Sequence, residues 1–226
     1  MDKNEEEKLD RLFDFFREID REKLITRQTY VTGAVRMEND AEHAWHMAVM
    51  AIMLSGYSNK KIDVLKTVSM LLIHDLVEIY AGDTYAYGGV SKEEQHEREA
   101  KSADRLFSMI PEGGKKLRAL WDEFERADTP ESRFAHTMDN IQPMMLNDYT
   151  GGKAWKEHGV HLFQILKRNE HTAEGSEILW EYAKKKSWNP MWGRRLRSKD
   201  RLPLSAFHLL LDSSCLLLSP FAFGLG

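Results

Sequence analysis

One stretch of the chain places charged residues where the surrounding pattern predicts a buried helix. Residues 68–82 read VSMLLIHDLVEIYAG, with His74, Asp75 and Glu78 among apolar neighbours. A buried carboxylate without a partner costs on the order of several kcal/mol or takes up a proton. A divalent cation compensates such acids most directly, because it is the largest positive charge that a protein interior holds. We therefore interpret this stretch as part of a metal centre.

The spacing of these three residues supports that interpretation. His74 and Glu78 are four positions apart, and Asp75 and Glu78 are three apart, so in a helix all three can lean toward one side. His74 and Asp75 are adjacent and would lie about 100° apart around the helix axis. The two side chains could then approach one ion from different directions.

Two other predicted helices offer further ligands. Residues 41–50 read AEHAWHMAVM, which places His43 in a first helical turn and His46 three positions later as the alternative. Residues 133–145 read RFAHTMDNIQPMM, with Asp139 among apolar residues. Imidazole and carboxylate ligands suit Mn, Co, Fe, Ni or Zn and do not distinguish among them. The set has no cysteine and leaves room for water, unlike a typical structural zinc site.

Length and composition indicate one ordinary soluble domain. The chain has 226 residues, of which 42% are hydrophobic and 30% charged, with few glycines and prolines. A net charge of −4 gives no basic excess for a nucleic-acid polymer. Cys215 is the only cysteine, the N-terminus is acidic and polar, and we find no clean apolar run of the ~18 residues that a membrane span needs. We expect a cytoplasmic protein without a membrane partner.

The apolar spacing predicts an all-α fold, with no sustained strand-like alternation. Asn4 with Glu7 is the predicted start of the first helix, and Asn39 with Glu42 that of the second. The later helices are predicted at about 60–81, from Ser91 to before Pro111, and at 114–127, 130–147, 155–168 and 173–186. The tryptophans at 45, 121, 155 and 180 are expected in the core. Residues 1–192 would form the domain, and residues 193–226 an atypical C-terminal tail of unknown role.

At this point the chain resembles the HD-domain superfamily of metal-dependent phosphohydrolases. The family signature is a His, a His-Asp pair and a distant Asp, all on helices, matched here by His43, His74-Asp75 and Asp139. The resemblance is closer to the small HD proteins that include bacterial 5′-deoxynucleotidases and their eukaryotic relatives. The matching stretches are RMENDAEHAWHMAVMA (36–51), LLIHDLVEIYAGDT (71–84), FERADTPESRFAHTMDNIQPMMLN (124–147) and GGKAWKEHGV (151–160).

This resemblance implies a single HD-domain helical bundle and a role for each matched residue. The metal ligands would be His43, His74, Asp75 and Asp139, with His43 preferred over His46 because it matches the family position. Glu78 would orient or deprotonate the attacking water. Asp83 would line the site and position the sugar or the water, and Arg27 would contact the substrate phosphate.

The chain departs from the family after that arginine. The deoxynucleotidases have a tryptophan there, whereas this chain has Gln28, with Tyr30 nearby as a candidate substrate contact, and one more residue before His43. The sugar preference of the substrate therefore stays open.

The expected function is that of a divalent-metal-dependent 5′-nucleotidase that acts on small nucleotides, deoxy forms preferred. The alternatives are a phosphodiesterase or another nucleotide-metabolite hydrolase, a non-catalytic metal- or nucleotide-binding regulatory module, and a helical interaction protein. Because relatives in this family are often dimers, we expect a homodimer.

Overall fold

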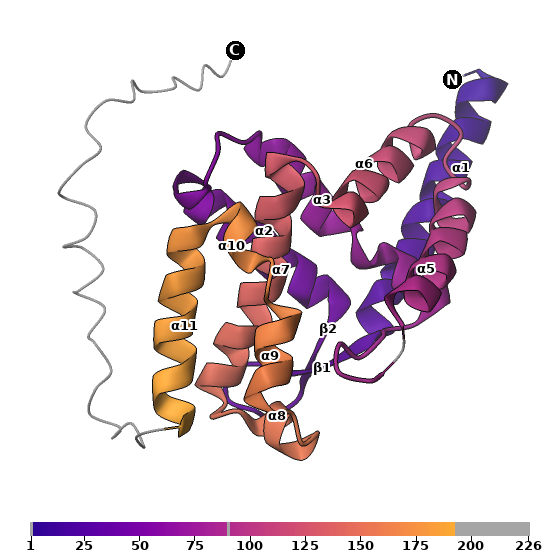
Figure 1. Cartoon of the computed structure of the whole chain (residues 1–226). Helices are drawn as coiled ribbons and strands as arrows, with labels where there is room; N and C mark the ends of the chain where they lie inside the picture. Colours follow the sequence, from indigo (N-terminus) through magenta and orange to yellow (C-terminus); the bar gives the residue numbers. More distant parts are fainter. Residues whose placement is uncertain (1, 90, 193–226) are drawn as a thin grey trace, which may run out of the picture.

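The computed structural model describes residues 2–89 and 91–192, so the predicted tail at 193–226 lies outside the described residues. This part of the chain is helical except for one short ribbon, which confirms the predicted all-α class (Figure 1). The helices are α1 (Lys3–Ile19), α2 (Asp40–Leu54), α3 (Val64–Ile73), α4 (Glu78–Ala81), α5 (Lys92–Phe107), α6 (Gly114–Arg126), α7 (Pro130–Tyr149), α8 (Lys153–Glu157), α9 (Leu162–Arg168), α10 (Thr172–Gly175) and α11 (Glu177–Trp192). Short 3₁₀ turns are η1 (Asp20–Leu24), η2 (Ser55–Tyr57) and η3 (Asp75–Val77).

Helix α7 is the central element of the bundle. It packs against α2, α3, α6, α10 and α11 (Figure 1). Thr129 caps its first turn and Pro130 occupies the first helical position, as the sequence predicts. The predicted capping box of Asn39 and Glu42 at the start of α2 is also present. These caps determine where the two helices that carry Asp139 and His43 begin.

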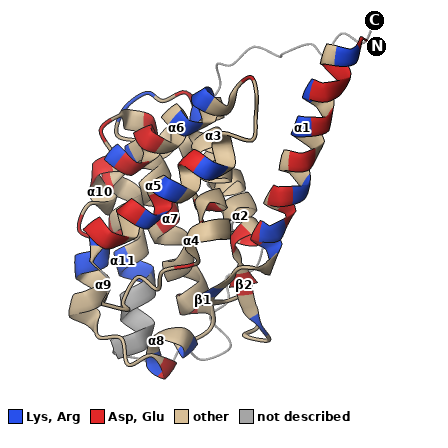
Figure 2. Ribbon diagram, turned by 90° about the vertical axis from the view of Figure 1, so that its right-hand side faces the viewer, with Lys and Arg blue, Asp and Glu red and all other residues tan. Residues whose placement is uncertain are grey.

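The first helix begins before its predicted position. Asp2 is the N-cap of α1 and accepts a 2.8 Å hydrogen bond from the backbone N–H of Glu5. Asn4 and Glu7 therefore lie inside the helix, and the prediction that they cap it is wrong. Figure 2 shows α1 extending beside the other helices with acidic and basic residues along its length. Its outer apolar side chains, Phe13 and Phe16, are exposed.

The predicted helix at 60–81 is not continuous. Helix α3 ends at Ile73, η3 covers Asp75–Val77, and α4 begins at Glu78. The backbone N–H of Glu78 bonds to the carbonyls of Asp75 and Leu76, while the carbonyl of His74 accepts a 3.1 Å hydrogen bond from Trp121 Nε1. The His-Asp pair therefore lies at the junction between an α-helix and a tighter turn, rather than in mid-helix.

Two predicted C-terminal helices are each divided in two. Gly159, at φ +62°, lies between α8 and α9, where one helix was predicted at 155–168. The helix predicted at 173–186 is instead α10 followed by α11. Gly175 ends α10 against α7, where a Cβ atom would lie 2.2 Å from the backbone oxygen of Arg133. Only glycine permits this close approach of the two helices.

The chain also forms an antiparallel ribbon that the sequence pattern does not predict. Strands β1 (Thr26–Tyr30) and β2 (Met37–Asn39) pair Thr26 with Asn39 and Tyr30 with Met37. The register shifts between these pairs, because β1 carries more residues than β2 over the same span. This bulge contains Arg27, and bulges commonly redirect a side chain. The ribbon leads directly into α2.

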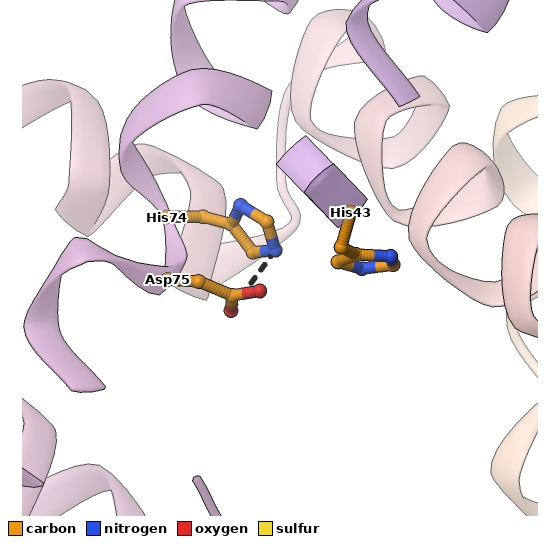
Figure 3. A group of neighbouring side chains, drawn as sticks. All are labelled: His43, His74 and Asp75. Carbon is orange, nitrogen blue, oxygen red and sulfur yellow. Dashed lines mark ion pairs between the residues drawn. The ribbon is translucent and has the colours of Figure 1, made fainter. Parts of the chain in front are cut away.

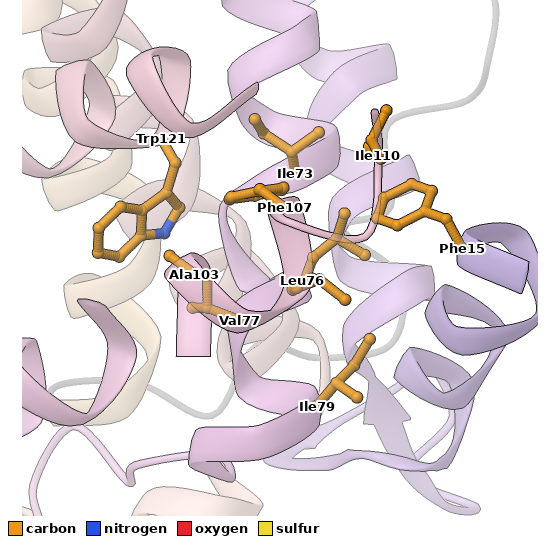
Figure 4. Close-up of a cluster of buried hydrophobic side chains, with 10 residues drawn as sticks. Phe15, Ile73, Leu76, Val77, Ile79, Ala103, Phe107, Ile110 and Trp121 are labelled. Carbon is orange, nitrogen blue, oxygen red and sulfur yellow. The ribbon is translucent and has the colours of Figure 1, made fainter. Parts of the chain in front are cut away.

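In the described part of the chain, three hydrophobic clusters fill the interior. The first, around α3–α6 and the inner face of α1, includes Phe107 and Trp121 (Figure 4). The second lies between α2, α3 and α7, and the third joins α7, α8, α9 and α11. Trp121, Trp155 and Trp180 are buried, as predicted. Trp45 is 64% exposed, so its predicted core position is wrong; the buried residues of α2, such as Met47 and Ala51, lie on another face of that helix.

Candidate metal centre

Three buried side chains from two neighbouring parts of the fold form a group that could hold a metal ion. His43 lies in the first turn of α2, His74 at the end of α3 and Asp75 at the start of η3. One ligand atom from each lies within 4.8 Å of the others. Figure 3 shows His74 and Asp75 side by side and His43 on the opposite side of the space between them. The structure therefore brings together three of the four predicted ligands.

Both imidazole rings are held by their Nδ1 atoms. His43 Nδ1 donates a 2.9 Å hydrogen bond to Gln142 Oε1, and His74 Nδ1 donates a 3.0 Å bond to the backbone oxygen of Leu71. These bonds place a proton on Nδ1 and leave Nε2 for a metal, which is the usual arrangement of histidine ligands. His74 Nε2 is buried and has no hydrogen bond among the described residues, although Asp75 Oδ1 lies 3.0 Å away. A shared cation would satisfy both atoms.

Asp139, the fourth predicted ligand, lies beside this group on α7. Its Oδ1 is 3.2 Å from His43 Nε2, and its Oδ2 accepts a 3.2 Å hydrogen bond from Arg168 Nη2. Burial opposes ionisation of Asp139, but His43 and Arg168 lower its pKa well below the usual value. The carboxylate is thus held ionised at the edge of the group. His46, the alternative ligand, instead places Nδ1 3.2 Å from Gln142 Nε2.

Carboxyl groups outnumber cations around these ligands. Burial and the charge of Asp75 raise the pKa of Asp40 to about 7, and the same two causes raise that of Glu78. Burial opposes protonation of His74, yet Asp75 raises the pKa of this imidazole to about 9. In the metal-free chain, protons therefore offset part of the negative charge. A divalent cation fits this donor set and would replace such protons.

The predicted catalytic and substrate residues lie at different places. Glu78 is buried in α4, and its Oε2 has no partner among the described residues. Asp83 follows α4, and burial raises its pKa while the nearby charge of Arg27 lowers it. Arg27 is partly buried and donates from Nη1 to Asp75 Oδ2 at 2.7 Å. Tyr30 points instead to α8, where its hydroxyl donates a 2.9 Å hydrogen bond to Glu157 Oε2.

Four residues at this site were not predicted. Gln142 bonds His43 and also donates a 2.6 Å hydrogen bond to Glu38, which is itself buried. Asp40 accepts a 3.2 Å bond from Arg27, and Arg168 bonds Asp139. Gln142 carried a usable signal, because it lies three positions after Asp139 and so shares its helix face. The other three depend on contacts between segments far apart in sequence.

Comparison with protein families agrees with this geometry. A family model described as an HD domain matches residues 19–180, a span that contains His43, His74, Asp75 and Asp139. The chain belongs to the HD-domain family. The resemblance predicted from the His, His-Asp and Asp signature is thereby confirmed.

Individual HD-domain relatives are similar over much of the chain. The 5′-deoxynucleotidase HDDC2 of Danio rerio is 25% identical over 190 residues, which cover 75% of this chain and 94% of that protein. The human protein of the same name is 29% identical over 136 residues, so the chain spans 65% of its length. A crystal structure from Magnetospirillum magnetotacticum, described as a predicted metal-dependent phosphohydrolase, aligns with a TM-score of 0.74 and 41% identity, and covers 79% of this chain and 90% of the other.

Proposed function

We propose that this HD-domain protein is a divalent-metal-dependent 5′-nucleotidase that releases phosphate from (deoxy)nucleoside 5′-monophosphates. The observation that carries the proposal is the buried group of His43, His74 and Asp75, with a carboxyl oxygen of Glu78 on the following helix that has no hydrogen-bond partner among the described residues. The names of the relatives support the same chemistry and the same substrate class.

His43, His74, Asp75 and Asp139 would hold one divalent transition-metal ion. When bound, such an ion lowers the pKa of a coordinated water and polarises phosphoryl oxygens. Glu78 accepts the proton of the attacking water. The water oxygen bonds to phosphorus while the bond between phosphorus and the ester oxygen breaks, the leaving ester oxygen takes up the proton, and the products are a nucleoside and orthophosphate.

Arg27 and Asp83 complete the proposed reaction site. Arg27 is held against Asp75 by a 2.7 Å hydrogen bond, so its positive charge lies next to the ligand group. There it stabilises negative charge that develops on the phosphoryl group. Asp83 lies near Arg27 and positions the sugar or the water. Tyr30 would contact the substrate from the α8 side of the ribbon.

Catalysis is favoured over a regulatory module that only binds metal or nucleotide. The position of Glu78 disfavours its ionised form, since burial and the charge of Asp75 raise the pKa of its carboxyl. A protein without chemistry at this site gains nothing from burying that group beside the ligands, because an apolar residue would cost less. Hydrolysis of a diester or of another nucleotide-like metabolite uses the same machinery and is the second candidate.

We also propose that the chain forms a homodimer in the cytoplasm. Helices α2 and α3 expose several apolar side chains, namely Trp45, Val49, Ile52 and Met53 on α2 and Leu65 and Leu72 on α3. Exposed apolar side chains gathered on neighbouring helices commonly mark an interface. No helix in the described part of the chain is both long and apolar enough to cross a membrane. Light scattering of the purified chain measures the mass, and a monomer at micromolar concentration would contradict the dimer.

The activity is tested by phosphate release from a panel of ribo- and deoxynucleoside 5′-monophosphates, with a cyclic nucleotide as the diester. Each substrate is combined with Mn²⁺, Co²⁺, Mg²⁺ or EDTA, and Asp75→Ala is the control. We expect metal-dependent release from monoesters that is lost in the variant. Release from the diester alone would support the second candidate. A chain that binds metal yet hydrolyses none of these substrates would contradict both enzymatic proposals.

A further inference from the structure

Arg168 differs from Arg27 in its access to solvent. It is the last residue of α9, and its backbone is fixed by two buried neighbours, Ile165 and Asn169. Asn169 Nδ2 donates a 2.8 Å hydrogen bond to the carbonyl of Ile165 and so holds the end of the helix. The side chain of Arg168 is 41% exposed, against 17% for Arg27. Arg168 is thus a partly exposed cation at a helix end that is held by a side-chain hydrogen bond.

Arg27 donates hydrogen bonds from one nitrogen to two carboxylates of the protein itself. Its Nη1 donates to both Asp75 Oδ2 and Asp40 Oδ1, at 2.7 and 3.2 Å. Its Nε atom is buried and has no partner among the described residues. This geometry suits a charge that offsets the acids of the site. With 17% of its side chain exposed, Arg27 offers less surface to an incoming anion than Arg168 does, although its charge still acts on a phosphoryl group beside Asp75.

Arg168 bonds Asp139, whereas Arg27 bonds Asp75 and Asp40. Its Nη2 bonds Asp139 Oδ2, while the other oxygen of the same carboxylate lies 3.2 Å from His43 Nε2. One carboxylate therefore separates Arg168 from the imidazole that faces the metal position. A guanidinium has five N–H donors in a planar fork that matches phosphate oxygens. Four of these donors are not used by Asp139.

We propose that Arg168 binds the phosphate group of the substrate on the solvent side of the metal ligands. The ligand class is a phosphate dianion, as a monoester or as inorganic phosphate. The identity of the ester rests on the proposed function, but recognition of the phosphate by Arg168 does not. The competing explanation is that Arg168 only neutralises Asp139.

The test compares the full-length, metal-loaded chain with Arg168→Ala and Arg168→Lys. The matched control is Lys167→Ala, which removes one exposed positive charge from the same turn of α9. Calorimetry with inorganic phosphate measures the dissociation constant without turnover. KM and kcat for a nucleoside monophosphate, inhibition by the free nucleoside, and metal content complete the comparison.

We expect Arg168→Ala to weaken phosphate binding and to raise KM by about 10- to 100-fold, as for loss of a charge-assisted hydrogen bond. Inhibition by the nucleoside, which lacks the phosphate, and the metal content should stay unchanged. Arg168→Lys should recover part of the affinity, because it keeps the charge without the fork. Lys167→Ala should change either constant by less than about twofold, as exposed charges contribute little.

Equal phosphate affinities of Arg168→Ala and Lys167→Ala would overturn the proposal. So would a loss of metal in Arg168→Ala that fully accounts for the weaker binding, since Arg168 would then act on Asp139 alone. If the wild-type chain hydrolyses no monoester but binds phosphate through Arg168, the proposed function fails and this inference stands. If the wild-type chain hydrolyses monoesters and Arg168→Ala leaves both the activity and KM unchanged, the inference about Arg168 fails and the proposed function stands.

Discussion

The carboxyl of Glu78 combines burial with an oxygen that has no partner among the described residues. Replacing it by glutamine keeps the shape of the side chain and removes its ability to accept a proton. We expect Glu78→Gln to lower kcat by about 10²-fold or more, the usual contribution of a general base. Metal content, measured by mass spectrometry, should match that of the wild-type chain. A variant that turns over at the wild-type rate would remove Glu78 from its assigned role.

Gln142 orients a metal ligand without reaching the metal position. Its Oε1 accepts from His43 Nδ1 at 2.9 Å, while its Nε2 donates to Glu38. Replacing Gln142 by leucine removes the bond that selects the His43 tautomer. We expect a loss of metal affinity of about 10- to 100-fold, which is typical of residues that support a ligand from behind. Competition with a chelator measures the affinity, and thermal unfolding of the metal-free variant serves as the folding control. An unchanged affinity would contradict the role.

Some residues of the site can be predicted from the sequence alone, and others cannot. His74 and Asp75 contrast with the apolar residues around them, and that contrast needs no knowledge of the fold. Asp40 has no such contrast, because an acid in the first turn of a helix is ordinary. It becomes unusual only when the ribbon places Arg27 3.2 Å from it and burial raises its pKa to about 7. Arg168 likewise could not be predicted as a site residue, because only the folded structure brings it into contact with Asp139.

At the scale of elements, the junction of α3, η3 and α4 is a feature that the sequence does not predict. Nothing in residues 68–82 predicts a break, since the local spacing is helical throughout. The break coincides with hydrogen bonds from other elements: Trp121 Nε1 donates to the carbonyl of His74, and Ser102 Oγ donates to that of Val77. In a continuous helix those carbonyls would accept from residues four positions later. Tertiary contacts have thus overridden the local pattern.

The contact of α10 with α7 depends on Gly175. A Cβ at that position would meet the backbone oxygen of Arg133 at 2.2 Å and Thr137 Oγ1 at 2.3 Å. Gly175→Ala should therefore force the two helices apart and lower the free energy of unfolding by about 3 kcal/mol, at the upper end of overpacking effects. Gly56→Ala is the matched control, because nothing lies within 4 Å of its added methyl. Chemical denaturation measures both, and equal stabilities would contradict the close approach.

Helix α5 carries a buried acid whose effect depends on pH. Burial raises the pKa of Glu99 to about 7 from its ordinary value of 4.5, although a hydrogen bond from Gln95 opposes the shift. The unfolded chain therefore ionises Glu99 first, and the cost to stability grows from about pH 4.5 until it is complete above pH 7. Glu99→Gln removes that cost. The free energy of unfolding of the variant, relative to that of the wild-type chain, should therefore be higher at pH 8 than at pH 5 by on the order of 2 kcal/mol.

Chemical denaturation at the two pH values measures this gain. Glu97→Gln, an exposed change in the same helix, is the control and should leave stability unchanged at both. A Glu99→Gln variant with the same advantage at pH 5 and pH 8 would show that ionisation of Glu99 is not the cause.

Across the whole molecule, the proposed ligands come from α2, the α3–η3 junction and α7, which are distant in sequence. The unfolded chain cannot hold these groups together, so metal binding adds to the stability of the folded state. At a metal concentration of about 100 times the dissociation constant, the gain is about 2.7 kcal/mol, or about 5–10 °C in Tm. EDTA should reverse this shift, and Asp75→Ala should show none. A Tm that does not respond to any divalent ion would contradict the site.

The helical class of the molecule could be predicted, but the partners of each helix could not. Apolar spacing shows that α2 has a buried face, and the caps of α2 and α7 show where these helices begin. Which helix covers which face depends on contacts that the spacing does not encode. Trp45 illustrates this, since a large aromatic residue is normally expected in the core, yet it lies on the exposed face of α2.

The bulge in the β1–β2 ribbon has a consequence for the divergence of such chains. Its two ends are pinned by the pairs Thr26–Asn39 and Tyr30–Met37, while the extra residues are taken up in between. Insertions or deletions here change the length of the chain before His43 without moving α2, whose start is set by the Asn39 cap. The side chains that β1 presents, Arg27 and Tyr30, can therefore be exchanged or shifted over evolutionary time while the ligands keep their places. The ribbon is where substrate range would be expected to diversify among relatives that share one metal chemistry.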